Sequence, residues 1–154
     1  MELILWRHAE AEFGEPDLGR RLTGKGEKQA HRIAQWLHAN LPDSARILVS
    51  PALRAQQTAQ ALVELSHRKT RTVDGLAPGA GVQELLDIAG WPGARAPVVV
   101  VGHQPTLGLV ASQLLAGIQL PWSVKKGAIW WLSARTRDGE SRTVLRAVIS
   151  PDLA

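Results

Sequence analysis

Two histidines and two arginines each follow closely after a short apolar run of the sequence. These residues are Arg7, His8, Arg54 and His103. A guanidinium group holds a phosphate through paired, charge-assisted hydrogen bonds, and a neutral imidazole nitrogen is a nucleophile. Two arginines and two histidines brought to one place would therefore form a strong anion site, with a phosphate group as its natural occupant.

Three short apolar runs must position these side chains. Residues 3–6, 47–49 and 98–101 are rich in branched side chains and do not alternate with polar residues. That pattern is typical of strands covered on both faces in a parallel sheet. Ligands of such sheets bind at the carboxyl ends of the strands, so the residues that follow the three runs are expected to converge at one edge of the sheet.

Helical patterns lie between the apolar runs. Thr23 is a good N-cap for a first helix, which should end before Pro42. In a second helix, Ser50 is expected to cap the free backbone N–H groups and Pro51 to occupy the first helical position, with the helix running to about Leu65. Two further helices are predicted over residues 82–88 and from Pro105 to near Gly117.

Towards the end of the chain, the hydrophobic pattern changes from one typical of helices to one typical of strands. Residues 128–132 and 143–149 indicate strands, and the turn-like residues 137–140 lie between them, so a terminal hairpin is predicted. The expected fold class is α/β, with three layers: a mostly parallel central sheet flanked by helices, and a C-terminal antiparallel hairpin.

The composition indicates one domain over residues 1–154. The 154 residues are 45% hydrophobic, which is enough to bury a continuous core. The sequence has no cysteine, which excludes disulfides, thiolate metal sites and cysteine nucleophiles and fits a reducing compartment. No apolar run approaches the roughly 20 residues of a membrane span, and the first residues do not resemble a signal peptide. A cytoplasmic protein with no membrane contact is therefore expected.

The charge balance favours an anionic partner. Lys and Arg number 18 against 14 Asp and Glu, for a formal net charge of +4. No basic run reaches five residues, and the longest basic cluster, residues 67–71, is expected in a solvated connection. A phosphate-sized ligand explains this balance as well as nucleic acid does, and no nucleic-acid partner is predicted.

Four segments together resemble the motifs of the histidine phosphatase superfamily, which has the phosphoglycerate mutase-like fold. The resemblance covers nearly the whole chain and is greatest to the small SixA-type phosphohistidine phosphatases. The matching segments are residues 5–11 (LWRHAEA), 20–26 (RRLTGKG), 50–58 (SPALRAQQT) and 102–103 (GH).

The resemblance implies a role for each residue of the predicted anion site. His8 would be the nucleophile that forms a phosphohistidine intermediate, while Arg7, Arg54 and His103 hold the phosphoryl oxygens. Arg20 would be a secondary phosphate contact, although the neighbouring Arg21 is an alternative. The charges of the nearby guanidinium groups disfavour protonation of an imidazole and keep it nucleophilic. This scheme requires no metal and no cofactor.

Two departures from the family bear on the leaving group. Pro78 stands where many relatives have a glutamate that acts as general acid, and Gln104 stands where others have an aspartate after the second histidine. Without an acid, a leaving group that departs easily is favoured, and the nitrogen of a phosphohistidine is one. Three carboxylates remain as possible acids: Glu10, Glu12 and Asp74.

The chain also has no insertion long enough for the lid that covers small sugar phosphates in mutases, so a shallow site is expected. Such a site suits a histidine-phosphorylated protein as substrate. Two alternatives remain: a phosphatase of small phosphate esters, and a phosphoprotein-binding module without turnover.

Other conspicuous residues have simpler interpretations. His31, His38 and His67 are expected to be solvated rather than metal ligands. Most of the six tryptophans should pack in the core, although Trp91 and Trp122 have the alternative of lining the site or a partner surface. Lys125 and Lys126 are expected in a solvated turn before a strand.

Overall fold

A six-stranded sheet forms the centre of the molecule, in the order β3-β2-β4-β1-β5-β6. The computed structural model describes residues 1–154. Strands β1 to β4 are parallel to one another, whereas β5 is antiparallel to β1 and β6 is antiparallel to β5. This confirms the predicted fold class. The strands are β1 (Glu2–Arg7), β2 (Arg46–Val49), β3 (Thr70–Thr72), β4 (Val98–Gly102), β5 (Ile129–Arg137) and β6 (Glu140–Ile149).

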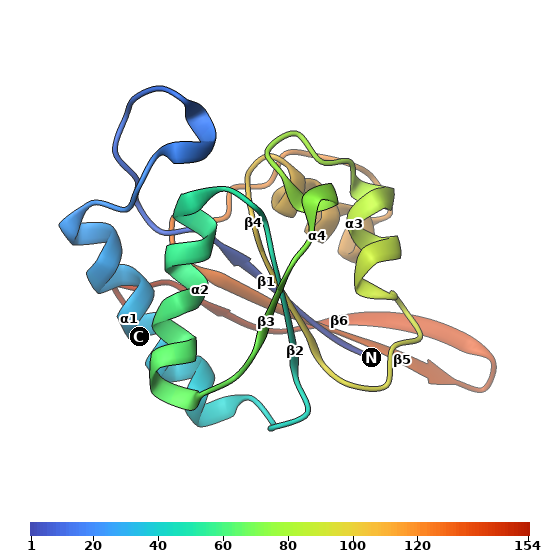
Figure 1. Ribbon diagram of the computed structural model, residues 1–154. Helices are drawn as coiled ribbons and strands as arrows, with labels where there is room; N and C mark the ends of the chain where they lie inside the picture. Colours follow the sequence, from blue (N-terminus) through green and yellow to red (C-terminus); the bar gives the residue numbers. More distant parts are fainter.

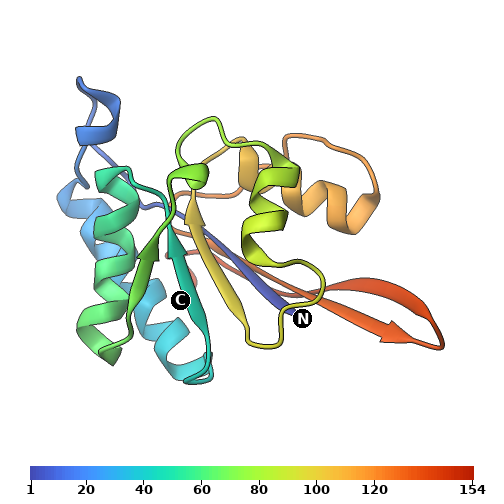
Figure 2. The ribbon, with the colours of Figure 1, turned by 45° about the vertical axis from the view of Figure 1, so that its right-hand side comes forward.

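Helices cover both faces of the sheet (Figures 1 and 2). Along β1, Leu3 and Leu5 belong to the apolar core shared with α3 and α4, whereas Ile4 and Trp6 belong to the core shared with α1 and α2. Both faces of the strand are therefore buried, which is why its sequence is continuously apolar. The helices are α1 (Gly24–Asn40), α2 (Leu53–Ser66), α3 (Val82–Ala89) and α4 (Thr106–Ala116), with single 3-10 turns at Asp17–Gly19 and Asp74–Leu76.

Three of the four predicted helices begin and end close to the expected residues. The Thr23 side chain accepts a hydrogen bond from the Gly26 N–H at 3.0 Å and caps α1, as predicted. Helix α4 ends at Ala116, and the following Gly117 has a φ of +74°, the left-handed conformation common after helices.

The predicted start of the second helix is wrong. Helix α2 begins at Leu53 with Ala52 at the N-cap, so neither Ser50 nor Pro51 holds its predicted helical position. The Ser50 hydroxyl accepts a hydrogen bond from the Ala52 N–H at 3.2 Å, within the turn that joins β2 to α2. A second hydrogen bond of the same hydroxyl, to His103, explains why it lies at the end of the strand rather than at the helix.

Two strands at the sheet edges differ from the predictions. The basic cluster expected in a solvated connection includes β3, whose three residues are exposed and therefore lack an apolar pattern. The C-terminal hairpin is longer than predicted, because polar residues continue the pairing up to Asp138 and Gly139. These two residues have φ values of +53° and +80°, as in a two-residue turn with primed geometry. The hairpin extends away from the helical layers (Figure 2). No helix has the length and apolar character that a membrane crossing requires.

Candidate active site

A pocket of about 230 Å³ lies where the carboxyl ends of β1 and β4 meet the start of α2. Arg7 is the last residue of β1 and pairs with Gly102, so His8 and His103 follow two adjacent parallel strands. Arg54 lies in the first turn of α2. The structure thus brings the predicted site residues together around one cavity. Its lining is Arg7, His8, Ala11, Phe13, Arg20, Arg54, Pro78, His103, Gln104 and Lys126.

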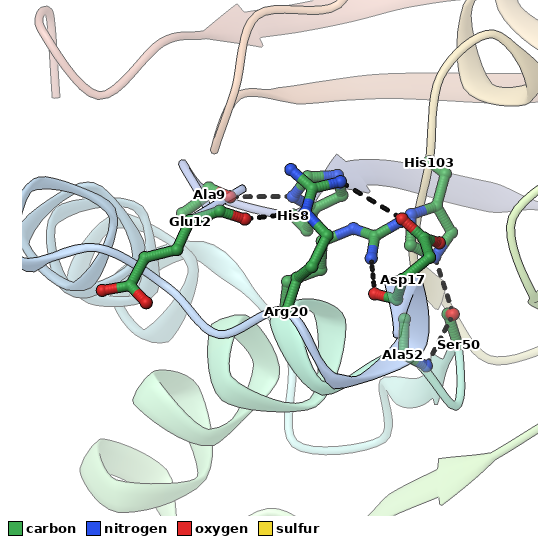
Figure 3. A network of polar contacts seen from close by, with 9 residues as sticks. His8, Ala9, Glu12, Asp17, Arg20, Ser50, Ala52 and His103 are labelled. Carbon is green, nitrogen blue, oxygen red and sulfur yellow. Dashed lines mark hydrogen bonds and ion pairs between the residues drawn. The ribbon is translucent and has the colours of Figure 1, made fainter. Parts of the chain in front are cut away.

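The imidazole of His8 is held by its own segment of backbone. Its Nδ1 atom lies 2.8 Å from the Ala9 carbonyl oxygen, and since a carbonyl only accepts, Nδ1 carries the proton (Figure 3). The backbone on both sides is also fixed: the His8 N–H donates to Gly102 O, and Gly127 N–H donates to His8 O, each at 3.1 Å. Nε2 of His8 is therefore the nitrogen left with a lone pair for reaction.

Burial and positive charge both keep His8 neutral. Burial, which is opposed by the hydrogen bond to Ala9, together with the charges of Arg54, Arg7 and Arg20, lowers the pKa of His8 to about 4. A protonated imidazole cannot attack phosphorus. The low pKa keeps the ring in its nucleophilic form at neutral pH.

His103 lies beside His8, with the two ring centroids 5.1 Å apart. Burial, then the neighbouring His8 and Arg54, lowers the pKa of His103 to about 3. Its Nε2 atom forms a 2.7 Å hydrogen bond with the Ser50 hydroxyl, while Nδ1 is buried without a partner. With Ser50 donating to Nε2, Nδ1 carries the ring proton and is a hydrogen-bond donor without a partner in the protein.

Ser50 contacts a candidate site residue, whereas the sequence predicted a role in helix capping. Its hydroxyl is fully buried and connects the turn after β2 with the residue after β4. The signal that could have identified it was present, because Ser50 begins the segment that resembles the family motif.

The two predicted arginines are anchored through one edge of each guanidinium group. Arg7 Nη1 donates to Val124 O at 2.8 Å, and Arg54 Nη1 donates to Asp17 O at 2.8 Å. The Nε atoms of both arginines are buried and have no partner. Both side chains therefore keep unused N–H donors beside His8 while their positions are fixed.

Asp17 was not anticipated from the sequence. Its carboxylate accepts hydrogen bonds from Arg20 Nη1 at 3.2 Å and from Arg54 Nη2 at 3.3 Å (Figure 3). Its slight burial acts to raise its pKa, but the hydrogen bond from Arg20 and the charge of Arg54 outweigh this and hold the pKa below its usual value. Asp17 thus partly neutralises two cations of the pocket.

Arg20 lines the pocket and Arg21 does not. Arg20 Nε donates to Glu12 O at 2.7 Å, and its guanidinium group faces the ring of Phe13 at 5.9 Å. Arg21 pairs with the Glu12 carboxylate at 3.2 Å and is mostly exposed. Of the two candidates, Arg20 is the one that lies at the pocket.

None of the three candidate acids lines the pocket. The Glu10 carboxylate accepts a hydrogen bond from the Thr23 hydroxyl at 2.8 Å, Glu12 pairs with Arg21, and Asp74 lies in the second 3-10 turn. Both ends of the Gln104 amide are occupied, by Trp122 O and by the Gly108 N–H.

The remaining conspicuous residues lie elsewhere. Trp91 and Trp122 pack against the core beside α3 and α4 and take no part in the pocket lining. His31, His38 and His67 are exposed, as expected.

Comparison with known proteins relates this site to a family. Residues 3–78 match the model of the histidine phosphatase superfamily, branch 1. A SixA homologue of Haemophilus influenzae, called a phosphohistidine phosphatase, is 33% identical, over 74% of this chain and 77% of its own. Uncharacterised relatives from Mycobacterium tuberculosis are also 33% identical, and the match spans 66% of their length.

Solved structures of similar proteins have the same fold over almost the whole length of this chain. A SixA-type protein from Nakamurella multipartitia superposes with a TM-score of 0.78 at 29% identity, covering 97% of this chain and 95% of the other. The protein histidine phosphatase SixA in complex with tungstate gives a TM-score of 0.78 at 26% identity, covering 99% and 98%. The chain belongs to branch 1 of the histidine phosphatase superfamily and is similar to its SixA phosphohistidine phosphatases.

Proposed function

We propose that the protein is a phosphohistidine phosphatase that acts on a histidine-phosphorylated protein through a covalent intermediate on His8. The observation that carries the proposal is the state of the His8 ring. Its Nδ1 proton is committed to the Ala9 carbonyl, its pKa is about 4, and its Nε2 atom faces a pocket lined by three arginines and a second histidine.

In the first step, His8 Nε2 attacks phosphorus opposite the nitrogen of the substrate imidazole. The N–P bond to His8 forms as the P–N bond of the substrate breaks, and the bonding pair stays on the departing nitrogen, which takes a proton from solvent. Arg7, Arg20 and Arg54 hold the phosphoryl oxygens, with His103 Nδ1 as a further donor. Fixed donors stabilise the charge spread over these oxygens in the transition state.

In the second step, water attacks phosphorus and the bond to His8 Nε2 breaks, which releases inorganic phosphate and restores the neutral imidazole. The positive charge that the phosphoryl group requires comes from side chains in this scheme. We therefore propose that the reaction needs no metal ion.

The missing acid supports a phosphoramidate substrate. Pro78 occupies the pocket lining and has no proton to donate, and both ends of the Gln104 amide are bonded to backbone. An alkoxide leaving from an ester would need such a donor, whereas an imidazole nitrogen protonated by solvent does not. A carboxylate in the pocket lining could protonate the leaving group and would favour a small phosphate ester as substrate. No carboxylate lines the pocket.

The mouth of the pocket supports a macromolecular substrate. Phe13 lines the pocket and is 98% exposed, and Leu18 in the same loop is half exposed. Apolar side chains so placed are suited to contact with a partner's surface rather than to enclosing a small molecule. A related SixA structure holds tungstate, a tetrahedral oxyanion like phosphate.

The test compares phosphate release from a histidine-phosphorylated protein and from a sugar phosphate, using the wild-type chain and His8→Ala, with and without a chelator. We expect the phosphoprotein to be strongly preferred, His8→Ala to be inactive and the chelator to have no effect. A quenched reaction should contain an acid-labile, alkali-stable phosphoenzyme. Preferential ester hydrolysis would overturn the substrate assignment, and tight binding without turnover would indicate a binding module.

A further inference from the structure

A second cavity, of about 410 Å³, lies beside the candidate active site and is strongly basic. Helix α1 contributes cations from its first turns, and the loop before β5 contributes two more. Five cationic side chains face a single carboxylate, and no hydrophobic side chain takes part. We call this cavity the basic groove. It is lined by Lys25, Lys28, Gln29, Arg32, Lys125, Lys126, Pro151 and Asp152.

The basic groove adjoins the active-site pocket. Lys126 belongs to the lining of both cavities. The loop that carries Lys125 and Lys126 is also tied to the catalytic strand, because Val124 O accepts the hydrogen bond of Arg7 Nη1 and Gly127 N–H donates to His8 O. The backbone of this loop therefore has a fixed position relative to the nucleophile.

The floor of the basic groove is closely packed. Gly127 has a φ of +75°, and a Cβ atom there would lie 3.0 Å from Pro151 Cγ and 3.2 Å from Gln29 Cβ. Gln29 in turn accepts a hydrogen bond from the Glu10 N–H at 2.9 Å. The three segments that form the groove thus meet in a closely packed junction.

Most of the groove's positive charge is unused within the protein. Lys25, Lys28 and Lys125 are exposed and take part in no ion pair or side-chain hydrogen bond. Lys126 has one weak pair, to Glu10 at 3.9 Å, and Arg32 donates to Pro151 O at 3.4 Å. Exposed cations gathered in one place raise the local potential and attract anionic groups.

We propose that the basic groove docks an acidic surface of the phosphorylated protein substrate, next to the residue whose phosphoryl group enters the active-site pocket. This inference rests on the proposed function. The groove opens beside the pocket that receives the phosphoryl group, so one partner can fill both. Carboxylates fit its lining, in which five cationic side chains outnumber the one carboxylate, that of Asp152. A nucleic acid is less suited, because the groove has no aromatic side chain on which a base would stack.

The test uses the triple variant K25E/K28E/K125E, which leaves every residue of the active-site pocket unchanged. Its substrates are a histidine-phosphorylated phosphotransfer domain with acidic residues beside its phosphohistidine, and free phosphohistidine. We expect KM for the protein to rise by about tenfold or more, because charges at the rim of an interface govern association. The kcat for the protein and the activity on free phosphohistidine should stay unchanged, and KM should depend less on salt than in the wild type.

A matched control reverses three exposed cations at another cavity. Arg46, Lys69 and Arg71 line a cavity of about 290 Å³ near the edge strand β3, away from the active site. The variant R46E/K69E/R71E carries the same change in net charge, and we expect its KM for the phosphoprotein to stay within about twofold of the wild-type value. An equal rise in KM for both triple variants would mean that overall charge, and not the groove, attracts the substrate.

Failure of this inference and failure of the proposed function give different results. If the wild-type chain prefers the phosphoprotein and K25E/K28E/K125E retains its KM, the docking proposal is overturned and the function stands. If the wild-type chain does not dephosphorylate the protein, the docking proposal is tested by direct binding of the same acidic domain in its unphosphorylated form. Binding about tenfold weaker in K25E/K28E/K125E than in the wild type supports docking in the groove. Equal binding by the two overturns the docking proposal. Loss of affinity only for a single-stranded oligonucleotide would assign the groove to nucleic acid and overturn the proposal.

Discussion

The floor and the rim of the active-site pocket are built in different ways. On the floor, His8, Arg54 and His103 are buried and attached to β1, α2 and β4, elements whose apolar faces form the core. On the rim, Phe13 and Asp17 lie in the exposed loop between β1 and α1, which is held by ion pairs of Arg20 and Arg54. The groups proposed for chemistry are therefore positioned by the core, whereas the groups proposed for recognition are held by a few polar contacts near the surface.

The largest effect is expected on the floor, from Arg54→Lys. Lysine keeps the charge but loses the planar, forked geometry, so one side chain can no longer hold two phosphoryl oxygens and Asp17 at once. We expect kcat on phosphohistidine to fall by about a hundredfold to a thousandfold. Arg68→Lys is the matched control, because Arg68 is also largely buried and bonds backbone carbonyls, at Leu41 and Pro42, outside the pocket. Equal losses of kcat in both variants would contradict a specific role for Arg54.

Lowering the pH should destabilise the folded protein through His8, a residue of the pocket floor. The pKa of His8 is about 4 in the folded protein against about 6.5 in an unfolded chain. The unfolded chain therefore takes up a proton first as the pH falls. The contribution of His8 to stability is complete above pH 6.5 and is lost progressively as the pH falls to about 4, with a total on the order of 3 kcal/mol. Denaturant unfolding at several pH values, compared between wild type and His8→Gln, measures this loss. A wild-type His8 ring that titrates near pH 6.5 by NMR would refute the assignment.

A smaller effect is expected from Ser50→Ala, which acts through another residue. Loss of the hydroxyl leaves Nε2 of His103 without its partner and frees the ring to adopt the other tautomer. We expect kcat to fall by about tenfold to a hundredfold with little change in KM, as when the outer partner of a functional histidine is removed. Ser50→Thr, which restores a hydroxyl, should recover part of the activity. Ser112→Ala removes an equally buried serine that bonds backbone at Ile118 and should leave kcat unchanged.

The smallest effect is expected on the rim, from Asp17→Asn. The carboxylate competes with phosphate for Arg20 and Arg54, but it is half exposed, so each pair contributes little. We expect inorganic phosphate to inhibit the variant at a concentration about twofold to fivefold lower than the wild type. Asp43→Asn, at an exposed carboxylate near Arg68, is the control. Weaker inhibition by phosphate in Asp17→Asn would show that Asp17 helps to hold the arginines rather than competing for them.

The same division explains how much of the molecule could be predicted from sequence. His8 and His103 could be predicted because each follows an apolar run with one residue between, and the carboxyl-end rule for parallel sheets needs nothing more. Ser50 was recognised as conspicuous but assigned to helix capping, because the same residue type serves both purposes and only the three-dimensional contact with His103 separates them.

The rim was less accessible to prediction. Asp17 and Phe13 lie in a loop with no hydrophobic period, and their positions depend on contacts with Arg20 and Arg54 that no spacing indicates. Strand β3 was missed for a related reason, since an edge strand of three exposed residues leaves no apolar pattern. The basic groove combines α1 with residues more than a hundred positions later, and Lys125 and Lys126 alone indicate only a solvated turn.

The parallel pairing of β1 with β4 has a consequence for how the chain acquires activity. The two histidines become neighbours only when two segments that are far apart in the sequence pair, and such distant contacts form late because the intervening chain must first be ordered. Helices α1 and α2 involve local contacts and can form earlier. During refolding, recovery of catalysis should therefore lag behind recovery of helical circular dichroism, and the enzyme's own turnover would report the moment at which the central strands join.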